Sequence, residues 1–254
     1  MEQFNDFTIS EQFTLPSKGL MYSRPVNPHV SLRAMTTAEE MRRLSPTETP
    51  YKVMCEIIQD CIVGEKLGIP VYDLALCDYQ FLLHKLRIVT YGPEYKMSMY
   101  CPYCGQVSDT VINLDELDLV EYTEDFEELR KVFLPVCKKE IEIKLQTPRT
   151  IDEVNARIKE IKKRNKELSY DPSLLVTLQS IIKTVDGQVP NPISLEGFVK
   201  KLSMRDANIL LQQAKKLNGK VGLNTECVAR CAECGYEAVT TFRYSSEFFG
   251  PTID

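Results

Sequence analysis

Two copies of the motif Cys-x-x-Cys-Gly, far apart in the chain, constrain its fold more than any other sequence feature. They occupy residues 101–105 and 231–235, with 126 residues between the two pairs of cysteines. In such a turn both thiolates can face one ion, and the glycine permits the positive φ at which the turn tightens. Four thiolates close a tetrahedral shell around Zn²⁺ and leave no open position for chemistry. The predicted ligands of a structural zinc ion are Cys101, Cys104, Cys231 and Cys234.

The paired turns also allow two other interpretations, a redox dithiol and four unmetallated thiols. A redox dithiol is typical of a single Cys-x-x-Cys near a βαβ pattern, and no such pattern surrounds either pair. Zinc ribbons space their turns by roughly 15 to 20 residues, so this ribbon would carry a large insertion. Cys227 is a rival ligand because it has metal-compatible spacing with Cys231, but no glycine follows it. Zinc is the favoured interpretation, and the other two stay open.

The remaining cysteines suit a protein core in a reducing compartment. Cys55, Cys61 and Cys77 stand among apolar residues on helical segments, which predicts small buried thiols. Cys137 marks the predicted start of a strand. The nine cysteines are an odd number in a long chain, and the polar first residues do not resemble a signal peptide. We therefore expect synthesis in a reducing cytoplasm rather than a secreted disulfide framework.

Charge and composition narrow the kinds of function that this protein can have. The net charge of −5 and the pI near 5.3 argue against a general nucleic-acid binder, which usually has a basic face. No apolar stretch is long enough to span a membrane, so no membrane partner is expected. The chain lacks a phosphate-cradling glycine-rich loop, a His-Glu-x-x-His motif and a nucleophile elbow, and it has only two histidines. No small-molecule substrate is therefore expected, although the abundant carboxylates and lysines mean that the missing motifs do not exclude an enzyme.

The pattern of apolar residues predicts an α+β fold with helical domains around a small four-cysteine, zinc-ribbon-like β element. The predicted divisions are an extended N-terminal arm at 1–36, a helical domain at 37–94, the ribbon-like element at 95–114 plus 225–249, and a mainly helical insertion with one strand at 115–224. The arm carries large apolar side chains and is expected to dock, either on its own domain or on a neighbouring subunit. Those side chains are Phe4, Phe7, Phe13, Leu15 and Leu20.

Start and stop signals place the main helices within these divisions. A capping-box pattern at 37–40 opens a short helix, and a second helix is predicted over 50–63. Asp73 is the predicted cap of a third helix that ends before Gly92-Pro93. Ser203 is the predicted cap of the last helix. The acidic run at 115–128 is interpreted as a solvated face with Phe126 turned inward.

Three segments resemble the hub proteins of T4-like phage baseplates. Residues 14–22 (Thr-Leu-Pro-Ser-Lys-Gly-Leu-Met-Tyr) are similar to the Leu-Pro-Ser-Lys-Gly opening of that family. Residues 86–95, which lead into the first cysteine turn, resemble its central motif, and the phenylalanine-rich residues 242–249 resemble its ending. The resemblance implies a non-enzymatic structural or assembly component of the baseplate hub of a contractile-tailed phage. Its partners would be other baseplate and tail proteins, and it would reside in the virion tail after synthesis in the host cytoplasm.

Two rival functions remain beside this one. A zinc-ribbon nucleic-acid binding module would need a basic or aromatic surface near the cysteine turns. The residues available for such a surface are Tyr100, Tyr103, Arg230, Tyr236 and Arg243. An enzyme that uses zinc or a dithiol would need an open metal position or a thiol of low pKa.

Overall fold

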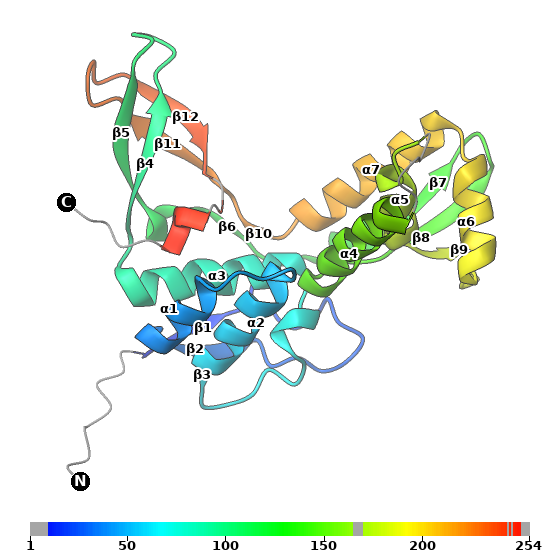
Figure 1. The fold of residues 1–254 in the computed structure, drawn as a ribbon, viewed down its shortest axis with the longest axis horizontal. Coiled ribbons are helices and arrows are strands. Elements are labelled where there is room, and N and C mark those ends of the chain that lie inside the picture. Colours follow the sequence, from blue (N-terminus) through cyan, green and yellow to red (C-terminus); the bar gives the residue numbers. More distant parts are fainter. Residues whose placement is uncertain (1–9, 165–169, 243, 245, 250–254) are drawn as a thin grey trace.

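The chain folds into a mixture of helices and small antiparallel sheets, as the α+β prediction required. The computed structural model describes residues 10–164, 170–242, 244 and 246–249. Figure 1 shows three parts: a helical centre with α1, α2 and α3, a β element made of two hairpins, and a second helical part that carries α4 to α7. No helix in these described ranges is both long and apolar enough to cross a membrane.

The N-terminal segment forms a sheet on the central helices. Strands β1 (Ser10–Thr14), β2 (His29–Arg33) and β3 (Ile62–Val63) pair in that order, all antiparallel. Leu15 and Leu32 are fully buried against the helices. Of the large apolar side chains predicted to dock, Leu15 therefore packs on its own domain and Phe13 is partly buried against the same core, whereas Leu20 is 60% exposed. Phe4 and Phe7 lie outside the described residues.

Three helices form the centre: α1 (Thr37–Arg43), α2 (Pro50–Cys61) and α3 (Leu76–Tyr91). The capping box of α1 starts one residue earlier than predicted, with Thr36 as N-cap and Glu39 as its partner. The prediction of Asp73 as the cap of α3 is wrong. Asp73 ends a short 3₁₀ helix, η1 (Val71–Asp73), and its carboxylate accepts a hydrogen bond from Arg149 at 2.5 Å. Helix α3 is buried on nearly all sides, so it is the central element of the fold.

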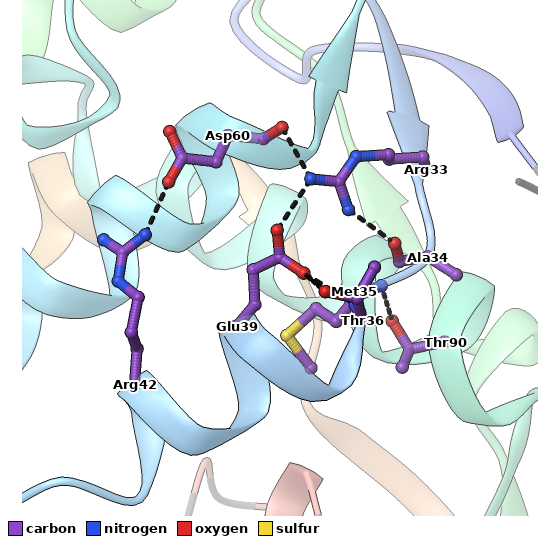
Figure 2. A network of polar contacts seen from close by, with 8 residues as sticks. All are labelled: Arg33, Ala34, Met35, Thr36, Glu39, Arg42, Asp60 and Thr90. Atoms are coloured by element: carbon purple, nitrogen blue, oxygen red, sulfur yellow. Dashed lines mark hydrogen bonds and ion pairs between the residues drawn. The ribbon is translucent and has the colours of Figure 1, made fainter. Parts of the chain in front are cut away.

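A polar network joins β2 to the three central helices (Figure 2). Arg33 donates to the Glu39 carboxylate at 2.7 Å and to the backbone oxygen of Asp60 at 3.1 Å. Arg42 on α1 donates to the Asp60 side chain on α2 at 2.6 Å. The backbone N–H of Met35 donates to the Thr90 hydroxyl of α3 at 3.1 Å. These contacts fix the position of α1, whose own seven residues are too few for a stable isolated helix.

The second helical part carries more sheet than predicted. Its helices are α4 (Pro148–Arg164), α5 (Ser173–Ile181), α6 (Pro192–Lys201) and α7 (Met204–Gly219), with Ser203 capping α7 as expected. Its strands are β6 (Leu119–Val120), β7 (Lys131–Leu134), β8 (Lys139–Ile143), β9 (Ile182–Val185) and β10 (Gly222–Leu223). The prediction of a single strand is therefore wrong, because four short strands lacked a clear alternation.

The sheet β7-β8-β9 covers the helices of this part with its apolar face. Leu134, Ile141 and Ile182 are almost completely buried there, together with Leu210 of α7. Cys137 lies in the turn between β7 and β8, not at a strand start, and its backbone N–H donates to the buried Asp206 carboxylate at 2.9 Å. The turn is thus fixed to the first turn of α7.

Short elements connect this part to the rest. The 3₁₀ helices η2 (Leu114–Glu116) and η3 (Glu124–Arg130) span the acidic run, in which Phe126 is fully buried and the carboxylates face solvent. Strands β6 and β10 pair antiparallel, so the outgoing and returning chains lie side by side. The chain therefore enters and leaves the second helical part at the same place.

Candidate metal centre

The two cysteine turns connect the strands of two hairpins. In the first, β4 (Glu94–Tyr100) pairs with β5 (Val107–Asn113); in the second, β11 (Glu226–Arg230) pairs with β12 (Glu237–Thr241). The hairpins lie against each other through β5 and β11 (Figure 1). Alternation places Met99, Ile112 and Ala229 on the buried side of their strands. On both sides of each turn, burial alternates from one residue to the next, as expected for β-strands that have one face against the core.

The two turns have the same backbone geometry. In the first, Cys101 N–H donates to the oxygen of Gln106 at 2.9 Å, and Gly105 N–H donates to the oxygen of Cys101 at 3.0 Å. The two corresponding hydrogen bonds of the second turn are each 2.9 Å long. Gly105 and Gly235 both have a φ of 72°, which explains why glycine follows each pair of cysteines.

The structure brings the four predicted ligands together. Their Sγ atoms all lie within 4.8 Å of one another, and Cys101–Cys234 and Cys104–Cys231 are separated by 3.7 and 3.8 Å. A tetrahedron with metal–sulfur bonds of about 2.3 Å has edges of about 3.8 Å. The cluster can therefore hold a metal ion. Cys227 is not in it, because this residue lies further along β11 opposite Thr240.

Ser108 of β5 supports the cluster and was missed by sequence reasoning. Its hydroxyl lies 3.5 Å from Cys231 Sγ and accepts the Ala232 N–H at 3.3 Å, so the hydroxyl proton is free to point at the sulfur. The hydrogen bond with Ser108 is the main cause that lowers the pKa of Cys231 to about 6. A deprotonated thiol is the form that binds metal. The inward position of Ser108 on an alternating strand was the available signal.

Aromatic side chains extend beyond the cysteines at the end of the ribbon. Tyr103 and Tyr236, one from each turn, stack with ring centroids 5.4 Å apart and planes 10° apart. Tyr100 and Tyr103 are largely exposed. These are three of the residues predicted for a nucleic-acid surface; Arg243 lies outside the described residues.

The segment at 86–95 fixes the base of the ribbon through Arg87. This side chain is 1% exposed and donates to the backbone oxygens of Phe248, Gly92 and Glu94 at 2.8, 2.8 and 3.2 Å. Its guanidinium also lies 4.9 Å from the centre of the Tyr91 ring. One buried cation thus ties α3, the start of β4 and the C-terminal 3₁₀ helix η4 (Ser246–Phe249) together.

The segment at 14–22 is fixed to the same helix through Ser17. Its N–H and hydroxyl donate to the buried Asp78 carboxylate at 3.1 and 2.5 Å, and the Tyr22 hydroxyl donates to it at 2.5 Å. Burial is the main cause that raises the pKa of Asp78. Gly19 has a φ of 74°, and a Cβ there would lie 2.4 Å from the oxygen of Val26. The hydrogen bonds of Ser17 and Tyr22 with Asp78 therefore fasten this segment to α3, and we call them the Ser17 staple.

His84 also has a packing role. Its Nε2 lies 2.8 Å from the oxygen of Leu114, and its ring stacks on Phe248 with centroids 6.2 Å apart. Desolvation lowers the pKa of His84 to about 4, so the ring is neutral near pH 7.

The predicted core thiols Cys55, Cys61 and Cys77 are all buried.

Comparison with known proteins agrees with the resemblance of these segments. Neither the curated proteins nor the solved structures contain a match to the chain. The sequences described as T4 bacteriophage base plate protein form a family that matches residues 8–250. The matched residues include both cysteine turns, Ser17 and Arg87. Because it covers nearly the whole sequence, the chain belongs to the T4 bacteriophage base plate protein family.

Proposed function

We propose that this protein is a non-enzymatic structural component of the baseplate hub of a contractile-tailed phage, held in shape by one zinc ion. The observation that carries the proposal is the family match over residues 8–250. The likeness of residues 14–22 and 86–95 to hub proteins supports the hub over other positions in the baseplate. The partners would be other tail proteins, and the location would be the virion tail.

The zinc ion would act as a clasp between distant parts of the chain. Cys104 and Cys231 are 127 positions apart, and the second helical part lies between them. A four-thiolate shell offers no position for water or substrate, which supports a structural role for the metal. Zinc binding would also add folding free energy to two hairpins that have little core of their own.

Mass spectrometry of purified virus particles tests the structural role. We expect the chain at a fixed ratio to known tail proteins in particles washed at high salt. Its absence from the particle, with the chain abundant in the infected lysate, would refute residence in the virion. Metal analysis of the purified protein is a separate measurement and should give one zinc per chain.

The exposed tyrosines favour one second candidate, a nucleic-acid binding ribbon. Tyr103 is 75% exposed and stacks on Tyr236, and such rings can stack on bases. Asp109, Glu233 and Glu237 lie near the same turns and oppose a phosphate backbone. A salt-sensitive band shift with single-stranded DNA that Tyr103→Ala abolishes would support this candidate.

A further inference from the structure

The outer end of the ribbon, which points away from the helices (Figure 1), carries exposed aromatic and apolar side chains. Tyr103 is 75% exposed, Tyr100 and Val107 are each 67% exposed, and Tyr236 is 44% exposed. Tyr100 and Val107 are opposite each other on the outward face of β4 and β5. Exposed apolar side chains that gather in one place are typical of interaction sites, whereas isolated ones are common on any surface. We call these four residues the ribbon tip.

The two turn tyrosines of the ribbon tip hold each other in place. The rings of Tyr103 and Tyr236 stack 5.4 Å apart with planes 10° apart, and the backbone of each turn is fixed by its own hydrogen bonds. Rings that are already positioned lose little conformational freedom when a partner binds. At 75% exposure, the face of Tyr103 that does not meet Tyr236 is open to solvent. Among the described residues, no cation lies over a ring of the ribbon tip.

The ribbon around these rings is acidic. Residues 94–113 and 226–241 contain five carboxylates and two cations, a net charge of −3 within a chain whose total is −5. In the outer half, residues 97–109 and 230–240, three carboxylates stand against one cation, Arg230. Four thiolates around the proposed Zn²⁺ would add about two further negative charges. The field of the ribbon therefore attracts a cationic partner and repels phosphate groups.

Two of these carboxylates lie close to the ribbon tip. Asp109 follows Val107 by two positions on β5, so strand alternation places both on the same outward face. Glu233 belongs to the second cysteine turn, three positions before Tyr236, and is exposed. Neither carboxylate forms an ion pair with a cation of the described residues. Both are therefore available to a cation that approaches the rings.

We propose that the ribbon tip binds a basic segment of another tail protein, whose lysine and arginine side chains lie over the open face of Tyr103 and on the carboxylates of Asp109 and Glu233. A cation over a tyrosine ring is attracted by the negative face of the ring. The carboxylates add attraction that acts before contact and selects basic partners. The proposal rests on the proposed function for the choice of partner protein.

Binding of tiled peptides tests the proposal. The probes are capped 15-residue peptides that cover the other tail proteins of the virus, labelled with a fluorophore and titrated with the zinc-loaded, full-length protein. We expect the peptides that bind to be basic, and their affinity to fall between about 50 mM and about 500 mM salt. Failure of every basic peptide to bind would overturn the proposal, as would equal binding of acidic peptides.

Charge reversal and ring removal locate the contact. Glu233→Lys should weaken basic peptides by about 10-fold or more, and Tyr103→Ala by about 3-fold or more. The matched controls are Glu128→Lys on η3 and Tyr170→Ala in the second helical part, both exposed, and they should leave affinity unchanged. Zinc content is measured for each variant. Asp109→Lys lies outside the cysteine turns and should weaken binding even where a turn variant loses its metal. Unchanged affinity in zinc-loaded Glu233→Lys or in Asp109→Lys would refute the contact.

The same charge reversal distinguishes a protein partner from nucleic acid. Glu233→Lys adds a cation, so it should weaken a basic peptide and strengthen a single-stranded DNA oligonucleotide. If the oligonucleotide binds the wild type, binds Glu233→Lys more tightly, and no basic peptide binds, the surface takes nucleic acid and the proposal is wrong. Absence of the chain from virus particles would instead reject the proposed function, whatever the peptides show.

Discussion

Replacement of Ser17 by alanine should measure how firmly the N-terminal sheet is fastened to α3. The Ser17 hydroxyl donates to Asp78 at 2.5 Å and accepts from the Gly19 N–H at 3.1 Å, and both Ser17 and Asp78 are 0% exposed. The Ser17 N–H and the Tyr22 hydroxyl still donate to Asp78 in the variant. Ser17→Ala therefore removes one hydrogen bond to an acidic group, worth about 1.5–3 kcal/mol, together with the weaker hydrogen bond from the Gly19 N–H.

This free energy converts to a measurable change in melting temperature. For a chain of this size, 1 kcal/mol corresponds to about 2–4 °C, so Ser17→Ala should lower Tm by about 3–12 °C. Differential scanning calorimetry measures the change directly. Ser45→Ala is the control, because the Ser45 hydroxyl bonds only the backbone oxygen of Met41 on the exposed end of α1. Its Tm should stay within about 1–2 °C of the wild type.

A double-mutant cycle with Asp78→Asn isolates the contact itself. The two single changes should be non-additive by about 1 kcal/mol or more, because Asp78→Asn replaces one of the two acceptor oxygens by an NH₂ group and so disturbs the hydrogen bond that Ser17→Ala removes. Additive effects, or a change in Tm for Ser17→Ala as small as that of Ser45→Ala, would show that the staple does not fasten the sheet.

Three further outcomes follow from the geometry. Cys101→Ser/Cys231→Ser should lose its zinc in elemental analysis, and full retention would reject the assigned ligands. Gly19→Ala should lower the free energy of unfolding, measured in urea, by more than about 1–2 kcal/mol, because it adds a backbone clash to a left-handed φ; an unchanged midpoint would contradict this. The hydrogen bond from Arg33 is the main cause that lowers the pKa of Glu39 to about 2. Its contribution is therefore present above pH 4.5 and lost as pH falls toward 2, so acid titration of Glu39→Gln should show a shallower loss of stability than the wild type.

Features encoded by short-range patterns were predictable from the sequence. The four-cysteine cluster could be predicted from two motifs alone, because the spacing of the cysteines and the following glycine set the geometry of each turn, although the chain between them is long. The cap of α7 at Ser203 and the burial of Phe126 likewise depend on a few neighbouring residues. These features share a local cause, so one sequence was enough to find them.

Features that depend on tertiary contacts were not predictable in the same way. Asp73 has the residue type of a helix cap, but the partner that holds it is Arg149, 76 positions away. Strands β6 and β10 are two residues long and exist because they pair with each other across the chain. Ser108 could be placed on the inner face of a strand, but its contact with Cys231 required the fold of the second hairpin.

The positions of these contacts predict an order in which the protein would unfold without the proposed zinc ion. Two-stranded hairpins are marginal alone, so the ribbon depends most on the clasp. Its base has a separate attachment, because Arg87 of α3 holds the carbonyls of Gly92 and Glu94 just before and within β4. The Ser17 staple, which contacts Asp78, lies near the other end of the same helix. Loss of zinc should therefore release the outer ribbon while α3 and the two hydrophobic cores stay folded. Hydrogen exchange would show this as lost protection in β11, β12 and the outer residues of β4 and β5, with α3 still protected. Equal loss of protection in α3 would mean that the clasp and the helical core form a single cooperative unit.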